Sequence, residues 1–319
     1  MKELNCDLHI IGGALTGLLT AYCASSLNLK IIISEKKNIR LRNKSSITDT
    51  RTTAISEGSK IFLNSQGLWK KIKSFAEPIK NIKVVDASAK SNIDFYNPVP
   101  KSNLGYIVKN SKLINLLINE LKKKNNVYFL KSEKINSISQ KNKNIISFSE
   151  NKKIKSKLII AADGKNSAVR HILGTNIFKK KYNEKALVIN FFHERSHKNT
   201  AYEFFFKSGP LAVLPMQKTK NKHQSSVIWS NKPGLVDIIG SSKLGKKYIK
   251  EILNEKICYF LGNVTKVNSI QSFPLTSHIN EKFYDNKIIY VGDAAHSIHP
   301  IAGQGWNLGV RDVKSLINL

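Results

Sequence analysis

The chain of 319 residues is poor in cysteine and has no long uninterrupted apolar run. Its three cysteines, Cys6, Cys23 and Cys258, show no paired spacing, which excludes a disulfide framework or a zinc knuckle and fits a reducing compartment. The first apolar segment is interrupted by glycines such as Gly12 and Gly17, so the sequence predicts neither a signal peptide nor a membrane span. We therefore expect a globular protein in the cytoplasm.

Arginine is scarce although the chain is strongly basic. The net charge is +30, with 52 lysine and arginine residues against 22 acidic ones, yet only six of the 52 are arginine. Arginine is the preferred reader of phosphates and bases, and the lysines are spread along the chain without an RNA-binding motif. We expect no nucleic-acid partner and interpret the lysines as solvated surface, while attraction to an anionic membrane stays open.

What the chain does have is a glycine-rich string near its C-terminal end. The string runs from His299 to Gly309, reads HPIAGQGWNLG and is followed by Asp312. A strand-like run over 287–292 and Asp293 come just before it. A glycine-rich loop between a buried strand and a helix lets backbone N–H groups approach a ligand and directs a helix N-terminus at negative charge. The pattern predicts an anionic cofactor here, with a plain glycine-rich turn as the alternative.

The N-terminal segment predicts a dinucleotide-binding βαβ unit. A strand over 7–11 precedes a turn that meets the GxGxxG spacing at Gly12 and Gly17 but has Ala14 at the middle position. A methyl group there crowds the phosphates of a dinucleotide without excluding them. Glu35 ends the next strand, where its carboxylate can accept hydrogen bonds from ribose hydroxyls.

Two further segments also have features of a cofactor-binding site. The apolar run over 157–161 predicts a strand and leads into ADGKNSAVR, in which we expect Ser167 to cap a helix and Arg170 to supply charge or an ion pair. Arg51, in DTRTTAIS, is one of only six arginines, which indicates a position that needs a guanidinium. A common Asp-Gly turn and a surface arginine are the respective alternatives.

Together these segments resemble the motifs of the single-component, FAD-dependent aromatic hydroxylases. HPxAGQGxNxGxxD is the form typical of the ubiquinone-biosynthesis hydroxylases, and ADGxxSxxR and DxRxxAL belong to the same family. The resemblance implies an α/β fold with a discontinuous Rossmann-like FAD-binding domain, residues 1–80, 104–180 and 275–319. It also implies an inserted, mainly antiparallel β-sheet substrate domain, residues 81–103 and 181–274.

The resemblance further implies which residues bind FAD. Asp293 would hold the ribityl hydroxyls, and the turn over 300–307 would face the isoalloxazine ring. No residue is identified as a catalytic base and no metal is expected. Catalysis is assigned only to the flavin-facing loop, Pro300, Gly303, Gln304 and Gly305. The expected cofactor-binding residues are Gly12, Gly13, Ala14, Gly17, Glu35, Arg51, Asp163, Gly164, Gly292, Asp293, Pro300, Gly303, Gln304, Gly305 and Asn307.

By the same resemblance the chain would be a monooxygenase that hydroxylates the aromatic ring of a polyprenylated phenol intermediate in ubiquinone biosynthesis. The resemblance implies a flavin C4a-hydroperoxide formed with O2, and NAD(P)H as the electron donor. It leaves open peripheral association with the inner face of the membrane or with a ubiquinone-biosynthesis complex. It does not identify the ring position that is hydroxylated.

Two alternative functions stay open at this point. One is a related flavoprotein hydroxylase that acts on a soluble phenol, and the other is a truncated, inactive flavin-fold protein. The second arises because the chain stops seven residues after Asp312. The sequence therefore predicts either a fragment or a variant that lacks a packing layer.

Two histidine patterns invite other interpretations. The segment HERSH, residues 193–197, satisfies HExxH, but that zinc motif needs a helix to bring both histidines to one face. Residues 187–192 have strand character instead, so we do not expect zinc. His296 and His299 flank the glycine-rich loop, where hydrogen bonds that fix the loop are favoured over an acid/base role.

Overall fold

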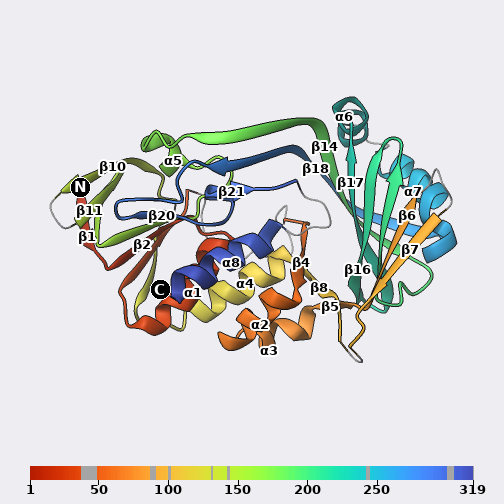
Figure 1. Cartoon of the computed structure of the whole chain (residues 1–319), viewed down its shortest axis with the longest axis horizontal. Coiled ribbons are helices and arrows are strands. Elements are labelled where there is room, and N and C mark those ends of the chain that lie inside the picture. Colours follow the sequence, from red (N-terminus) through yellow and green to blue (C-terminus); the bar gives the residue numbers. More distant parts are fainter. Residues whose placement is uncertain are drawn as a thin grey trace.

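A computed structural model of the chain shows two parts joined by a pair of long strands (Figure 1). One part is a layered α/β structure, and the other is built on one large sheet with two helices on its outer side. No helix in the described part of the chain is long and apolar enough to cross a membrane. The described residues are 1–36, 49–86, 91–99, 102–130, 132–141, 144–241, 245–299 and 305–318.

A six-stranded sheet, in the order β19-β20-β13-β2-β3-β9, forms the centre of the first part. All neighbouring strands except β19 and β20 pair in parallel. The central strands β2 and β3 are buried along their whole length, as expected for parallel strands covered on both faces. The strands are β2 (Leu8–Ile11), β3 (Ile31–Ser34), β9 (Val127–Leu130), β13 (Leu158–Ala161), β19 (Tyr284–Asp285) and β20 (Ile288–Tyr290).

Alternate residues of these strands pack on opposite faces of the sheet, in two separate hydrophobic cores. Ile10 and Ile33 pack with helices α1, α4 and α8, whereas Ile11 and Ile32 pack with the four-stranded sheet β1-β12-β11-β10 and helix α5. Figure 1 shows α1, α4 and α8 grouped on one side of the sheet. These elements are α1 (Leu15–Ala24), α4 (Asn110–Leu121), α5 (Ala168–Ile172), α8 (Gly305–Ile317), β1 (Lys2–Asn5), β10 (Ile135–Lys141), β11 (Asn144–Ser149) and β12 (Lys152–Ser156), with 3-10 turns η1 (Ser25–Leu27) and η3 (Gly292–Ala294).

The second part is an eight-stranded sheet in the order β21-β18-β14-β17-β16-β15-β6-β7. Its neighbours are antiparallel except β15 and β6. Helices α6 and α7 cover one face, where Leu187, Phe191 and Trp229 pack against Ile249 and Leu253. Strands β14 and β18 extend back to the first part (Figure 1). The elements are β6 (Asn81–Asp86), β7 (Ser91–Tyr96), β14 (Ile177–His193), β15 (Thr200–Phe206), β16 (Gly209–Thr219), β17 (Lys222–Asn231), β18 (Val264–Asn280), β21 (His296–Ser297), α6 (Pro233–Ser241) and α7 (Gly245–Leu261).

A small three-stranded sheet, β4-β8-β5, lies between the two parts. Ile107 of β8 and Ile79 of β5 pack against Ala212 and Leu214 of the large sheet, on the face opposite α6 and α7. That face is therefore partly covered by the small sheet, and the rest of it faces the first part. The elements here are β4 (Thr52–Ser56), β5 (Glu77–Ile79), β8 (Gly105–Lys109), α2 (Glu57–Ser65), α3 (Trp69–Ile72) and η2 (Lys73–Phe75).

The expected α/β fold, a discontinuous Rossmann-like domain with an inserted and mainly antiparallel sheet, is confirmed. The expected domain boundaries stay a prediction. Strands β6, β7 and β15 to β17 fall within 81–103 and 181–274, but β14 begins before residue 181 and β18 ends after residue 274. These two strands cross the expected boundaries and connect the two parts without a separate linker.

Because His9 is buried, we expect the free energy of unfolding to fall in acid. Its ring is fully buried, with Nε2 2.8 Å from Ser34 Oγ and Nδ1 2.8 Å from Ser147 Oγ, and burial lowers its pKa to about 3. Well above pH 6.5 His9 is neutral in the folded and unfolded states alike, so it adds no pH dependence there. As the pH falls below 6.5, the unfolded chain takes up a proton that the folded chain excludes. At pH 5.5 this favours unfolding by about 1.4 kcal/mol.

Urea unfolding at pH 7.5 and pH 5.5 measures this effect. Between the two pH values the free energy of unfolding should fall by about 1.4 kcal/mol less in His9→Gln than in the wild type. His171→Gln, at an exposed position of α5, is the control. Its free energy of unfolding should fall between the two pH values by as much as that of the wild type. An equal loss in the wild type and His9→Gln would contradict the prediction.

Candidate active site

A cavity of about 710 Å3 lies where the two parts meet. One wall comes from the segments that follow β2, β13 and β20 and from the start of α8, and the other comes from β14, β17 and β18. Ligands of open parallel sheets bind at this carboxyl edge of the strands. The lining includes Ala14, Thr16, Arg51, Thr52, Gly164, Lys165, Gly292, Asp293, Gly305 and Trp306 on the first side, and Ala186, Val188, Ile228, Phe273 and Leu275 on the second.

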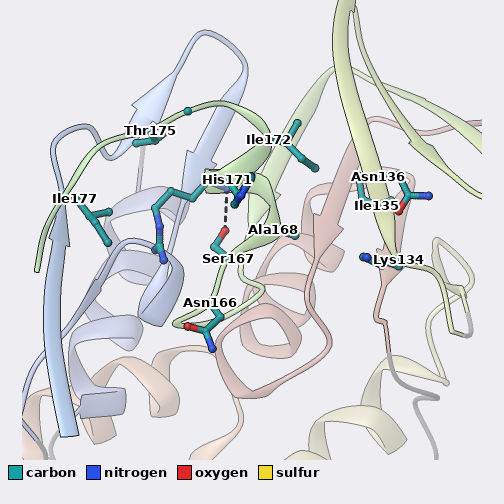
Figure 2. Close-up of a pocket in the computed structure, with 12 residues that line it drawn as sticks. Lys134, Ile135, Asn136, Asn166, Ser167, Ala168, His171, Ile172, Thr175 and Ile177 are labelled. Carbon is teal, nitrogen blue, oxygen red and sulfur yellow. Dashed lines mark hydrogen bonds between the residues drawn. The ribbon is translucent and has the colours of Figure 1, made fainter. Parts of the chain in front are cut away.

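A second cavity, of about 740 Å3, surrounds the short helix α5 (Figure 2). Lys134, Asn136 and His171 line it, and it has only Asn166 in common with the first cavity. None of the expected cofactor-binding residues that the structure describes lines this second cavity. The first cavity is therefore the candidate site, because it is lined by six of them: Ala14, Arg51, Gly164, Gly292, Asp293 and Gly305.

Glycines shape the turn after β2. Gly12 has a φ of 118°, and a Cβ atom there would lie 2.3 Å from the carbonyl oxygen of Ala162. A Cβ atom on Gly17 would lie 2.0 Å from the carbonyl oxygen of Gly12. Any side chain at these positions would force α1 away from the ends of β2 and β13. Both glycines therefore support the predicted dinucleotide turn through close backbone contact.

The start of α1 and the end of β3 complete this turn. Glu35 accepts a hydrogen bond of 2.8 Å from the N–H of Gly13. Ala14 precedes the first residue of α1 and has no side chain that could cap the helix. The first N–H groups of α1 thus keep hydrogen-bonding capacity and positive partial charge for an anion at the cavity that Ala14 lines.

The segment after β13 is ordered by its own side chains. Asp163 Oδ2 accepts hydrogen bonds from the N–H groups of Ala168 (2.6 Å) and Val169 (3.2 Å). Ser167 Oγ accepts the N–H of Arg170 at 3.0 Å, drawn as a dashed line in Figure 2, so the predicted helix cap is confirmed. Asp163 Oδ1 is buried without a hydrogen-bond partner in the described part of the chain. One oxygen of Asp163 therefore orders the turn, and the other lacks a donor.

Arg170 connects this turn to the neighbouring strand ends. Its guanidinium donates to the carbonyl oxygens of Lys165 (2.5 Å) and Ala294 (3.0 Å) and lies 3.1 Å from His278 Nε2. Burial lowers the pKa of His278 to about 4, so its neutral ring accepts this hydrogen bond. Arg170 therefore fixes the loop after β13 to η3 and β18 through hydrogen bonds with neutral groups.

Thr16 lies where the end of β20 meets α1 and α8. A Cβ atom on Gly292, which has a φ of 58°, would lie 2.7 Å from Thr16 Oγ1, and one on Gly309 would lie 2.8 Å from it. Asp312 accepts the N–H of Gly292 at 2.7 Å and lies 3.0 Å from His296 Nε2. The hydrogen bond to Asp312 raises the pKa of His296. His296 is thus hydrogen-bonded to α8, and its interpretation as a residue that fixes the loop stays a prediction.

Charged side chains gather on one side of the cavity. Asp49 holds the guanidinium of Arg51 through two hydrogen bonds of 2.8 Å, and this guanidinium lies 5.2 Å from the centre of the Phe273 ring. Burial raises the pKa of Asp293, although the nearby Arg51 and Lys165 act in the opposite direction. Burial also lowers the pKa of Lys165. An oriented cation and an acid thus face the same cavity and can bind a ligand with hydroxyl and anionic groups.

The remaining expected residues have different surroundings. The side-chain amide of Asn307 accepts the N–H of Ser56 (3.0 Å) and donates to the carbonyl oxygen of Ala54 (2.8 Å), so it fixes α8 to β4. Direct contact between Asn307 and a cofactor stays a prediction. Gly305 begins α8 and lines the cavity. Pro300, Gly303 and Gln304 lie outside the described residues.

His193, His197 and His299 are engaged in contacts within the fold. His193 lies on β14 and His197 follows that strand, and both ring nitrogens of each are hydrogen-bonded. Within the described residues, no group of three or more His, Cys, Asp or Glu is arranged to hold a metal ion. His299 Nε2 lies 3.6 Å from Glu184 Oε2, and its ring packs edge-on to Tyr182 with 4.9 Å between the centroids. His299 therefore connects the glycine-rich loop to β14.

Sequence reasoning missed several residues that shape the cavity. Thr16 and Lys165 occupy variable positions of the motifs, so no pattern marks them. Val188, Ile228 and Phe273 form the apolar floor on the large sheet. Val188 is paired with Ile228 across β14 and β17, a register that depends on contacts between distant segments. Apolar alternation indicated the strands but not which of their faces would meet the cavity.

Strand ends that converge on an anion-binding turn, beside a cavity with an apolar sheet as its floor, are typical of dinucleotide-binding proteins. The chain belongs to the FAD binding domain family, whose model matches residues 5–319. FAD is accordingly the cofactor that the fold is built to bind.

Individual relatives narrow this class. The chain is 29% identical over 311 residues to ubiquinone hydroxylase UbiL of Rhodospirillum rubrum, covering 97% of this chain and 71% of the relative. It is 25% identical over 321 residues to 3-demethoxyubiquinol 3-hydroxylase of Escherichia coli, covering 100% and 80%. The resemblance to ubiquinone-biosynthesis hydroxylases is thereby confirmed. Among solved structures, p-nitrophenol 4-monooxygenase PnpA of Pseudomonas putida has the same fold, with a TM-score of 0.80, 18% identity and coverage of 100% and 80%.

Because Gly309 lies against Thr16, we expect a methyl group at position 309 to destabilise the fold. Gly309→Ala would place Cβ 2.8 Å from Thr16 Oγ1, so we expect the free energy of unfolding to fall by about 1–3 kcal/mol and bound FAD to decrease. Thr16→Ala combined with Gly309→Ala should recover part of both losses, because the contact with Thr16 Oγ1 is then removed while Gly292 Cα stays at 3.3 Å.

Thermal unfolding and flavin content of the purified variants measure both effects. Gly58→Ala is the matched control, because a Cβ atom there meets nothing within 4 Å. If Gly309→Ala behaved like Gly58→Ala, the close contact between α1 and α8 would not be required.

Proposed function

We propose that this chain is an FAD-dependent monooxygenase that hydroxylates the aromatic ring of a polyprenylated phenol intermediate in ubiquinone biosynthesis. The observation that carries the proposal is a single cavity with two unlike walls. One wall has helix N-termini and charged groups for a dinucleotide, and the other has the apolar side chains of Val188, Ile228 and Phe273 for a ring. The relatives named as ubiquinone hydroxylases support the substrate class.

The residues of the first wall suit FAD. The N-terminus of α1 at Ala14 would take the pyrophosphate, Glu35 the ribose hydroxyls and Asp293 the ribityl hydroxyls. Asp163 would support this wall indirectly, because its Oδ2 accepts the N–H groups of Ala168 and Val169 and so orders the loop after β13. The N-terminus of α8 at Gly305 would stabilise negative charge on a flavin bound in this cavity.

When bound, FAD supplies the redox chemistry, accepting electrons from NAD(P)H and using O2 to place one oxygen atom on an electron-rich ring. The chain supplies position and the exclusion of water. Val188, Ile228 and Leu275 present apolar groups to the ring, so water has few hydrogen-bonding partners on that side. Asp49 and Phe273 hold Arg51 in one orientation, which keeps its charge fixed at the cavity.

Product analysis tests this proposal. The FAD-loaded protein, supplied with NAD(P)H and O2, should convert a prenylated phenol to a product that is one oxygen atom heavier, and a soluble phenol should be a poor substrate. Deletion in the source organism should lower ubiquinone and accumulate a precursor. Efficient turnover of soluble phenols only, or unchanged ubiquinone after deletion, would contradict the pathway assignment.

We further propose that the protein attaches to the surface of an anionic membrane. Ile93, Phe95 and Phe205 are each at least half exposed at the edge formed by β6, β7 and β15. Cross-strand pairing places Ile93 and Phe95 beside Val84 and Ile82, so both lie on the face of the sheet that carries Ile228. An exposed apolar edge on a chain of net charge +30 suits a negatively charged bilayer surface.

Flotation with lipid vesicles measures this attachment. We expect binding to vesicles that contain anionic lipid, little binding to zwitterionic vesicles, and a loss of binding at high salt. Phe95→Ser with Phe205→Ser should weaken binding severalfold, because apolar area is lost. Tyr259→Ser is the control, since Tyr259 is exposed on α7 across the sheet. An equal effect of all these changes would contradict the proposed edge.

A further inference from the structure

Side chains from two strands of the large sheet hold Thr50. Gln271 Oε1, on β18, accepts a hydrogen bond of 2.7 Å from the hydroxyl of Thr50 and one of 3.3 Å from its backbone N–H. Asn190 Nδ2, on β14, donates to the carbonyl oxygen of Thr50 at 2.8 Å. Both backbone polar groups of Thr50 are therefore bonded to side chains of the large sheet. We call Gln271 and Asn190 the Thr50 clamp.

Strand pairing does not hold Thr50 in place. Strand β4 begins at Thr52, and its pairing with β8 begins where Thr52 lies opposite Lys109. Just before the strand, the carbonyl oxygen of Arg51 accepts the N–H of Asn110, the first residue of α4, at 3.1 Å. Thr50 lies one residue further from β4, so its position depends on the Thr50 clamp.

The residue after Thr50 presents a cation to the cavity. Arg51 lines the cavity, and its side chain is 50% exposed. Asp49 accepts one hydrogen bond from Nε and one from Nη2 of this guanidinium. The remaining guanidinium N–H groups have no hydrogen-bond partner among the described residues. Arg51 can therefore donate to an anionic ligand in the cavity while Asp49 keeps its orientation.

We infer that Gln271 is a positioning residue for FAD, which acts through Thr50 to hold the guanidinium of Arg51 at the cavity. Gln271 does not itself line the cavity. Phe273, two residues further along β18 and on the same face, has its ring centre 5.2 Å from this guanidinium. Without Gln271 the segment at Thr50 gains freedom, and ordering it again weakens the binding of a ligand by Arg51. The inference rests on the proposed function, with Arg51 as a cofactor-binding residue, and adds that the large sheet contributes to cofactor affinity.

A double-mutant cycle of FAD affinity tests the inference. The dissociation constant of FAD is measured from the quenching of flavin fluorescence when the full chain, stripped of flavin, is added. Arg51→Met should weaken binding roughly 10- to 100-fold, because charge-assisted hydrogen bonds are lost. Gln271→Leu should weaken it roughly 3- to 10-fold. The double variant should bind FAD about as weakly as Arg51→Met alone, because Gln271 acts only through Arg51.

Conservative and matched variants complete the cycle. Thr50→Val removes the hydroxyl that Gln271 accepts and should weaken FAD binding, whereas Thr50→Ser keeps the hydroxyl and should bind as the wild type does. Gln217→Leu is the matched control, because Gln217 also connects the large sheet with another segment. Its Nε2 donates to the carbonyl oxygens of Ser74 (3.2 Å) and Ala76 (3.4 Å), and it does not line the cavity. Gln217→Leu should keep the FAD affinity of the wild type.

The outcomes separate this inference from the proposed function. If the wild type does not bind FAD, both fail. If Arg51→Met binds FAD as tightly as the wild type, Arg51 is not a cofactor-binding residue and the inference is wrong, while the proposed function stands. The inference is also wrong if Gln271→Leu has no effect, or if its effect multiplies with that of Arg51→Met in the double variant. If Gln271→Leu does not fold, the comparison of Thr50→Val with Thr50→Ser decides the matter.

Discussion

The segments that follow strands β2, β13 and β20 pack so closely that only glycine fits at their contact points. Gly12 lies against the backbone of Ala162, and Gly292 and Gly309 enclose Thr16. This contact brings the segments after β2, β13 and β20 to one edge, although they are far apart in sequence. The rest of the proposed site depends on it, because the helix N-terminus at α1 and the acidic side chains after β13 and β20 can contact one ligand only from that edge.

Hydrogen bonds then hold this edge in place. Arg170 connects the loop after β13 with η3, and Asp312 connects η3 with α8. The long strands β14 and β18 position the large sheet opposite this edge (Figure 1). The cavity thus has a polar wall that is fixed by backbone contacts and an apolar wall that belongs to a separate sheet. Such a division suits a cofactor on one side and a hydrophobic ring on the other.

Local patterns predicted the parts of this site that depend on backbone geometry. Gly12 and Gly17 could be identified because only glycine fits such turns, and the cap at Ser167 followed from its place before a short helix. The positions of Thr16 and of Val188 at the cavity could not be predicted, because each depends on packing or register between segments distant in sequence. The spacing of the motifs likewise gave no sign that β14 and β18 would cross both expected domain boundaries.

The central claim is that the close approach of these strand ends builds one FAD site. The most direct measurement is the flavin content of the purified, folded protein, from its visible absorbance and after saturation with added FAD. The account predicts one FAD per chain, retained through gel filtration, and a lower FAD content in Gly309→Ala. A folded protein that stays free of flavin after addition of FAD would contradict it.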